Sequence, residues 1–217
     1  MADQTEQSER EIFYVADPMC SWCWGFSPTL RTLSEFLGGR ADLTFIMGGL
    51  RPLTRTAMDD AQKFEIEQHW KSVAERSGQP FDHQFFQRDG FVYDTEPACR
   101  AVCVVRSVAR PLLLDFFEAL QRGFYAQNLD ITDAAVLSEI ARKQGVDHVA
   151  FEEHFADVAS AYETAGDFHA ARQLGVTGYP SVILRQGKDY AMLTAGYQDW
   201  DAVKAPLEQW FSNQPVH

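Results

Sequence analysis

Asp17-Pro18-Met19-Cys20-Ser21-Trp22-Cys23-Trp24-Gly25-Phe26 is the stretch that decides the fold of this chain. It follows the apolar run 12–16, which has the length and composition of a buried strand, and it opens a helical pattern that lasts to about Leu37. Two cysteines separated by two residues at a strand-to-helix junction are typical of thiol–disulfide chemistry. The sequence therefore predicts a redox-active pair, Cys20 and Cys23, at the start of a helix.

The sequence around this stretch predicts strands at both ends of the chain and helices in the middle. The run 43–47 indicates a second buried strand, so the first part is a βαβ unit with parallel strands and a right-handed crossover. Helical periodicity and helix-capping residues then dominate up to about residue 174. The runs 181–184 and 190–193, joined by a turn at Gly187-Lys188, predict a β-hairpin. A final helix is expected over 199–211.

Composition restricts the partners that this chain can have. Its 217 residues, 46% of them hydrophobic, suit one domain with an insertion or two small domains. A net charge of −12 argues against nucleic-acid or anionic-membrane partners, because phosphate contacts need clustered Lys and Arg. Residues 1–10 lack the features of a secretory signal and are expected to form a disordered tail. No apolar stretch suits a membrane span, so we expect a cytoplasmic protein without membrane or nucleic-acid partners.

Three features in this order resemble the DsbA-like family of thioredoxin-fold proteins, in its cytoplasmic branch of predicted disulfide isomerases. They are Cys20-Ser21-Trp22-Cys23 after the first strand, Pro28 in the helix that follows, and Gly178-Tyr179-Pro180 before the hairpin. The resemblance implies an α/β, thioredoxin-like fold, β-α-β … α-β-β-α, with an inserted all-helical domain. The implied parts are a discontinuous thioredoxin-like domain and an insertion: 11–52 with 166–214, and 53–165.

The resemblance also assigns roles to the motif residues. Cys20, at a helix N-terminus where free backbone N–H groups favour an anion, would be the exposed nucleophile, and Cys23 the more buried resolving thiol. A cis Pro180 would place the Tyr179 backbone beside Cys20, ready to pair with an extended substrate chain. Trp24 could line a substrate groove or belong to the core. The residues expected to tune the cysteines or contact substrate are Ser21, Trp22, Trp24, Gly178 and Tyr179.

One position departs from the family pattern. Many thioredoxin-fold enzymes have a buried acid six residues before the first cysteine, and here that residue is Tyr14. Asp17 is nearer in sequence but could be exposed at the surface. The sequence therefore leaves the proton acceptor for Cys23 unassigned.

The other two cysteines, Cys99 and Cys103, are four apart on a predicted helix. Together with the first pair they could form a four-cysteine zinc site. A disulfide between them is disfavoured, because Cβ atoms four apart on a helix are about 5–6 Å apart, and a disulfide needs about 3.5–4.5 Å. We favour two small buried thiols that pack the helix, with no metal site, and we expect all four cysteines to rest as thiols.

Two further segments could reach the cysteine pair. Arg51 could attract an anionic ligand such as a glutathione carboxylate, or it could be an ordinary surface residue. The segment 93–97 could approach the site, as the equivalent loop does in DsbA-like relatives, or it could only cap the next helix, which is the interpretation we favour.

The leading functional hypothesis is a thiol–disulfide oxidoreductase or isomerase without a bound cofactor. Its partners would be protein or glutathione thiols and disulfides, together with a redox recycling partner. One alternative is a glutathione-linked transferase or isomerase, although relatives of that kind typically have serine in the place of Cys20. The other alternative is a DsbA-like adaptor that delivers clients to a protease. The direction of electron flow is left open by the sequence.

Overall fold

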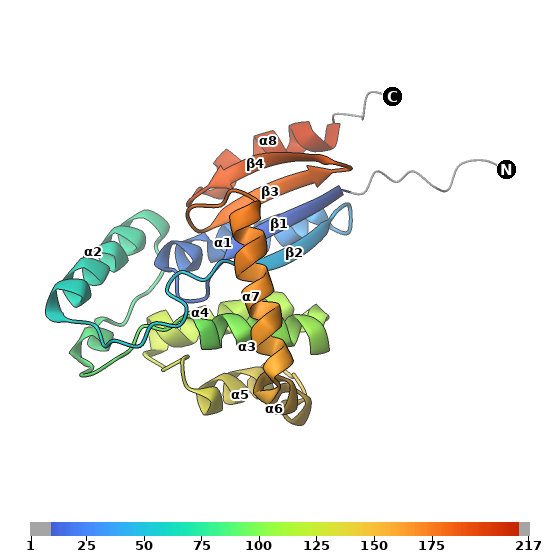
Figure 1. The fold of residues 1–217 in the computed structure, drawn as a ribbon. Helices are drawn as coiled ribbons and strands as arrows, with labels where there is room; N and C mark the ends of the chain where they lie inside the picture. The colour runs from blue at the N-terminus through green and yellow to red at the C-terminus, as the bar shows by residue number, and fades with distance from the viewer. Residues whose placement is uncertain (1–9, 213–217) are drawn as a thin grey trace.

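The computed structural model describes residues 10–212, whose four strands form one mixed sheet in the order β2-β1-β3-β4 (Figure 1). Strand β1 pairs in parallel with β2 and antiparallel with β3, and β3 pairs antiparallel with β4. This arrangement confirms the predicted βαβ unit and hairpin. The bounds are β1 Arg10–Ala16, β2 Asp42–Met47, β3 Ser181–Gln186 and β4 Asp189–Ala195. The predicted tail lies outside the described residues except for Arg10, which begins β1.

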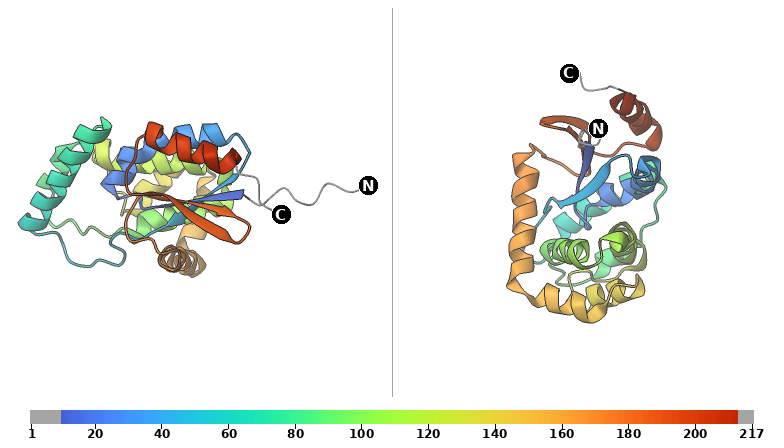
Figure 2. Two further views of the ribbon diagram at one scale, coloured as in Figure 1. Left: turned by 90° about the horizontal axis from the view of Figure 1, so that it is seen from above. Right: turned by 90° about the vertical axis from the view of Figure 1, so that its right-hand side faces the viewer.

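Helices cover both faces of the sheet. Helices α1 (Ser21–Leu37) and α8 (Trp200–Ser212) lie on one face, and α7 (Val158–Gln173) lies on the other (Figure 2). Alternate residues of β1 face opposite sides, as the pleat of a strand requires. Tyr14 stacks on Phe26 of α1 with ring centroids 5.9 Å apart. The cluster on the α7 side consists of Val15, Ile46, Ala171, Val176 and Ile183.

The helical block between β2 and β3 packs beside β2, an edge strand of the sheet (Figure 1). Arg106 from this block donates a hydrogen bond of 2.8 Å to the carbonyl of Phe45 in β2, which covers part of the exposed edge. Asp133 and Asp147 cap two of its helices. Its elements are α2 Asp60–Ser77, η1 His83–Gln87, α3 Glu96–Val108, η2 Arg110–Leu112, α4 Leu113–Gln127, α5 Ala134–Lys143 and α6 His148–Ala156.

Helix α7 is longer than the sequence pattern indicates. The pattern predicts a helix over 167–174, but α7 begins at Val158, where the Asp157 side chain caps it. The first half escaped detection because its apolar residues do not gather in one stripe. The boundary drawn between residues 165 and 166 falls inside this helix. Asp167 of α7 forms an ion pair of 2.6 Å with Arg106 of α3, so the helix ties the block to the sheet.

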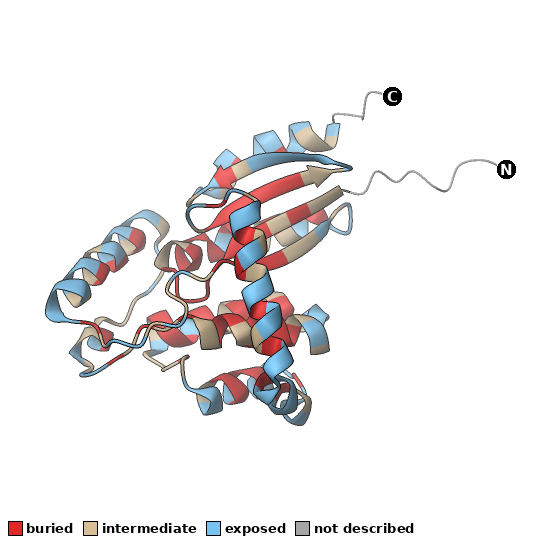
Figure 3. Ribbon diagram, viewed as in Figure 1, coloured by how far each residue is buried: buried red, intermediate tan, exposed pale blue. Residues whose placement is uncertain are grey.

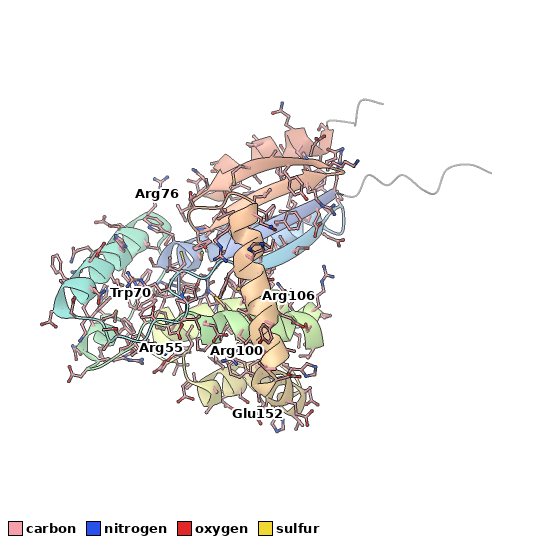
Figure 4. All side chains as sticks on the ribbon, viewed as in Figure 1. Arg55, Trp70, Arg76, Arg100, Arg106 and Glu152 are labelled. Carbon is pink, nitrogen blue, oxygen red and sulfur yellow. The ribbon has the colours of Figure 1, made fainter. Side chains whose placement is uncertain are left out.

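An aromatic cluster joins α2 to the helix that carries the two cysteines. Trp70, labelled in Figure 4, has its ring centroid 5.0 Å from that of Tyr125 in α4. Trp24 of α1 stacks on the same tyrosine, with its ring centroid 6.4 Å from that of Tyr125 and an interplanar angle of 7°. Figure 3 shows buried residues running from the sheet into the helical block. One hydrophobic core therefore supports both parts of the chain.

Candidate redox site

The two cysteines of the CxxC stretch lie at the beginning of α1 as free thiols. Cys20 is the N-cap residue, with extended backbone angles of φ −90° and ψ 115°, and its carbonyl accepts the first helical hydrogen bond, from the Trp24 N–H at 3.1 Å. The Cys20 sulfur is therefore placed at the positive end of the helix dipole. Cys23 follows in the first turn of α1, and its thiol interacts with that of Cys20.

The expectation of an exposed Cys20 is wrong, because only 5% of the residue is accessible. The backbone carbonyl of Tyr179 lies over it and accepts a hydrogen bond of 3.5 Å from the Cys20 Sγ. Cys23 is fully buried, as expected of a resolving thiol. Burial raises the pKa of Cys23 well above its usual value, and the neighbouring Cys20 raises it further.

The segment before β3 holds the Tyr179 backbone beside Cys20. The Tyr179–Pro180 peptide bond is cis. The hydroxyl of Tyr179 donates a hydrogen bond of 2.7 Å to the carbonyl of Gly48, at the end of β2. Burial, with the nearby charge of Asp17, raises the pKa of Tyr179 to about 12, so this hydroxyl stays a donor at neutral pH. These contacts place the Tyr179 backbone where the resemblance expects it.

A cavity of about 300 Å³ opens beside Cys20. Arg51 and His69 are the basic side chains that line it, and the remaining lining residues are uncharged or sulfur-bearing. A second cavity, of about 410 Å³, is lined by Arg76 and Tyr197. Arg76 is labelled at the end of α2 in Figure 4. Trp22 and Tyr179 line both cavities, so these two side chains stand between them.

Four of the five predicted tuning residues line the cavity at Cys20, namely Ser21, Trp22, Gly178 and Tyr179. Trp24 does not line it. Its side chain is 3% exposed, and its Nε1–H donates a hydrogen bond of 3.0 Å to the carbonyl of Pro80. The structure therefore places Trp24 in the core, which was the other interpretation offered by the sequence.

Tyr14 lies near Cys23, at the position where related folds have a buried acid. It is fully buried, and burial together with the neighbouring Cys23 and Cys20 raises the pKa of its hydroxyl well above the usual value. A phenol in this state does not accept a proton from a thiol at neutral pH. Tyr14 therefore fills the position without replacing the acid.

Asp17 is the residue whose place the sequence left open. It is fully buried, not exposed. Its carboxylate accepts hydrogen bonds from the backbone N–H of Met19 at 2.8 Å and from that of Leu50 at 2.7 Å. The Cys99 thiol donates to the same carboxylate with a sulfur–oxygen distance of 3.4 Å. The only local signal was the place of Asp17 directly after a buried strand, because Leu50 and Cys99 come from distant segments.

The segment 93–97 both approaches the site and begins a helix. The Tyr93 hydroxyl donates a hydrogen bond of 2.6 Å to the carbonyl of Met19, next to Cys20. The Thr95 hydroxyl accepts from the Arg51 N–H at 3.2 Å instead of capping α3. The favoured interpretation, that this segment only caps the next helix, is therefore incomplete. The segment also holds the loop that carries Arg51.

The remaining cysteines contact different carboxylates. Cys99 faces Asp17, whereas Cys103, one turn later, lies 3.6 Å from an oxygen of Asp167. Burial raises the pKa of both thiols, to about 12 for Cys103, so they stay protonated at neutral pH. Within residues 10–212, no cluster of three or more His, Cys, Asp or Glu side chains has the arrangement of a metal site.

A sequence profile of the DSBA-like thioredoxin domain matches residues 11–208. The chain belongs to this family. Among solved structures, a proposed protein disulfide isomerase from Nitrosomonas europaea is 32% identical, with a TM-score of 0.89 over 94% of this chain and 98% of that one. The cytosolic disulfide reductase DsbM from Pseudomonas aeruginosa is 24% identical, with a TM-score of 0.78 over 93% of this chain and 98% of that one. The DSBA-like fold is thus that of thiol–disulfide oxidoreductases.

Relatives of this chain that have a curated description are described as adapter proteins. The ClpXP adapter protein SpxH of Bacillus subtilis is 23% identical over 209 residues, which are 94% of this chain and 69% of that protein.

The described helices of the chain include none that is both long and apolar enough to cross a membrane.

Proposed function

We propose that this protein is a thiol–disulfide oxidoreductase that exchanges disulfides with a small anionic thiol of the glutathione type. One observation carries the proposal. Cys20 sits at the N-terminus of α1 and at the edge of a cavity of about 300 Å³ whose charged lining residue is the cation Arg51. The guanidinium of Arg51 supplies a positive charge beside Cys20 in a protein whose net charge is −12, so this cavity favours an anionic ligand.

The chemistry follows from the two sulfurs. The Cys20 thiolate attacks one sulfur of glutathione disulfide, forms a mixed disulfide and expels the first glutathione as a thiolate. Cys23 loses its proton and attacks the Cys20 sulfur, which closes the Cys20–Cys23 disulfide and releases the second glutathione. Two electrons pass from the dithiol to the substrate disulfide. Run in reverse, two glutathione molecules reduce the Cys20–Cys23 disulfide.

The accessibility of Cys20 supports a small substrate. With 5% of the residue accessible, its sulfur is reached through the cavity and not across a flat surface. A glutathione carboxylate can form a charge-assisted hydrogen bond with a guanidinium such as that of Arg51. The DsbM structure determined with GSH, 23% identical and with a TM-score of 0.77, shows that a protein of this fold binds glutathione.

Trapping the mixed disulfide tests the proposal. A Cys23→Ser variant lacks the resolving thiol, so exposure to glutathione disulfide should leave one glutathione attached to Cys20, detected by intact mass and peptide mapping. Cys20→Ser should form no such adduct. Cys103→Ser, whose thiol lies beside Asp167, is the matched control and should react like the unaltered protein. A Cys23→Ser protein that stays unmodified would overturn the proposal.

A second candidate function is that of an adaptor, favoured by the match to the SpxH proteins. Leu50 and Leu53, in the loop next to the cavity, are 42% and 70% exposed and could contact a client protein. An adaptor would bind its client equally well after replacement of both Cys20 and Cys23 by serine, and would lose binding when Leu53 is replaced by Asp. The oxidoreductase requires the opposite dependence on the cysteines.

A further inference from the structure

The second cavity, of about 410 Å³, meets the first at the residues that surround Cys20. Trp22 and Tyr179 line both cavities, and the Tyr179 carbonyl oxygen is 3.5 Å from the Cys20 sulfur. The Trp22 ring packs on that of Tyr197, a wall of the second cavity, with ring centroids 5.6 Å apart. Cys20 lines the first cavity and not the second. The redox site thus has two adjoining cavities, of which the function proposed above uses one.

Hydrogen bonds fix the loop that forms one wall of the second cavity. Gly196, directly after β4, lines the cavity, and its N–H donates a hydrogen bond of 2.7 Å to the carbonyl of Pro180. Two residues later, the carbonyl of Gln198 accepts a hydrogen bond of 3.3 Å from the Thr29 hydroxyl of α1. The loop is therefore tied both to the segment that covers Cys20 and to the helix that begins there.

Arg76, near the end of α2, is the charged residue that lines the second cavity (Figure 4). The chain just beyond it is held on α1, because the Gln79 amide nitrogen donates hydrogen bonds of 3.1 Å to the Trp24 carbonyl and 2.7 Å to the Ser27 hydroxyl. The Arg76 side chain is 63% exposed and lies 3.9 Å from a carboxylate oxygen of Asp199. A guanidinium has several N–H donors, so this long ion pair leaves some of them available to a further anion.

A disulfide substrate with two bulky halves needs more room than the first cavity offers. The two halves diverge from the S–S bond, because the Cβ–S–S–Cβ dihedral angle is about 85–100°. The attacked sulfur reaches Cys20 through the first cavity, whose volume of about 300 Å³ is at the lower end of the range for ligand sites. With one half there, the other half extends past Trp22 and Tyr179, which leads it into the second cavity.

We propose that the second cavity binds the other half of glutathione disulfide, the half that leaves as a thiolate, and that Arg76 binds one of its carboxylates. This inference rests on the proposed oxidoreductase function and gives its substrate a second site. The γ-glutamyl end of glutathione also carries an ammonium group, for which Asp199 beside Arg76 offers an acceptor. Arg76 is a specificity determinant, because it recognises the charge of the substrate and takes no part in the exchange of sulfurs.

The same cavity serves the reverse step, in which a second glutathione removes the glutathione attached to Cys20. The thiolate of the glutathione in the second cavity attacks the sulfur of the attached one. A new S–S bond forms between the two glutathione molecules, the bond to Cys20 breaks, and its electron pair leaves on the Cys20 sulfur. The proton lost by the attacking thiol goes to solvent.

This reverse step isolates the second cavity, because the attached glutathione fills the first. Cys23→Ser protein with glutathione on Cys20 is mixed with reduced glutathione, and loss of the adduct is followed by quenching and intact mass. Adding Arg76→Ala should raise the half-saturating glutathione concentration about 3- to 10-fold, as for loss of one exposed charge-assisted contact. Arg76→Lys keeps the charge and should cause a smaller rise. Lys71→Ala, an exposed cation of the same helix outside both cavities, is the matched control and should cause none.

Two probes separate recognition of charge from a defect in the site. N-acetylcysteine amide is a thiol with peptide groups but no carboxylate, and it should release the adduct equally fast with and without Arg76. S-methylglutathione has no free thiol and should inhibit release by glutathione competitively. Its binding to the adduct should shift the NMR signal of the Gly196 amide and leave that of Arg51 in place, since Arg51 lines the filled cavity.

The outcomes keep the two proposals apart. If Cys23→Ser protein forms no adduct with glutathione, the oxidoreductase function fails and the second site with it. If the adduct forms and glutathione releases it with the same half-saturating concentration in Arg76→Ala, the second site is overturned while the oxidoreductase function stands. An equal loss with N-acetylcysteine amide would also overturn it, because the cavity would then hold an uncharged peptide or the substitution would have disturbed Cys20.

Discussion

The Tyr179 ring packs directly against Gly48, whose carbonyl accepts the Tyr179 hydroxyl at 2.7 Å. The N–H of Gly48 in turn donates a hydrogen bond of 2.7 Å to the carbonyl of Ala16, at the end of β1. The segment that covers Cys20 is therefore fixed to the same strand ends that lead into α1. A Cβ atom at residue 48 would lie 2.0 Å from Cε1 of the tyrosine, so only glycine permits this contact.

Replacing Gly48 by Ala should displace the Tyr179 ring and, with it, the carbonyl over Cys20. We expect exchange with glutathione disulfide to slow by about tenfold or more and the free energy of unfolding to fall by about 1–3 kcal/mol, because overpacking forces neighbouring groups to move. Stopped-flow kinetics and urea unfolding measure the two effects. Gly166→Ala, in α7 where an added Cβ meets open space, is the control and should show neither loss. Normal kinetics in Gly48→Ala would show that this contact does not hold the site.

Asp17→Asn should change how stability depends on pH. Folding raises the pKa of Asp17 above its ordinary value of 3.8, so between that pH and the raised value the native state binds more protons than the unfolded state. The contribution of Asp17 to stability therefore falls as pH rises through this window and is level above it. Urea unfolding of both proteins at a series of pH values should show the unaltered protein losing stability relative to the Asn variant. A constant difference would contradict a raised pKa.

Arg51→Ala should weaken glutathione disulfide binding without altering the reactivity of the cysteines. Loss of one charge-assisted hydrogen bond should raise KM about tenfold or more, with a smaller change in kcat. The defect should shrink at high salt, where the attraction is already screened. Arg55→Ala, an exposed cation of the same loop, is the control (Figure 4). Equal KM values for the two variants would place glutathione elsewhere.

The two tryptophans of the CxxC stretch should respond in opposite ways. Trp24→Phe removes the hydrogen bond to Pro80 and part of a core ring, so it should lower the free energy of unfolding by about 1–3 kcal/mol and leave the exchange rate unchanged. Trp22→Phe changes the wall shared by the two cavities and should alter KM for glutathione disulfide with little effect on stability. Thermal unfolding and steady-state kinetics distinguish them. An exchange defect in Trp24→Phe alone would contradict its assignment to the core.

Local patterns in the sequence were enough to determine the strands, most helices and the place of the cysteine pair. The apolar run that forms β1, the caps at Asp133 and Asp147 and the turn at Gly187 each act within a few residues. Such signals are short-range because side-chain periodicity and capping depend on the nearest turn or strand pair. Helix α7 was underestimated because the residues that its first half buries, Ser160 and Thr164, are polar and form no apolar stripe.

Only the tertiary structure decided which groups surround the two sulfurs. Cys20 is covered by the carbonyl of Tyr179, which is 159 residues away, and Asp17 is buried under Cys99, which is 82 residues away. The burial of a carboxyl and the state of its proton depend on groups that arrive from other elements, so the spacing within the CxxC stretch carries no information about them. The sequence thus determined the pair of thiols, and the packing of α3 and the loops against it determined which residues can exchange their protons.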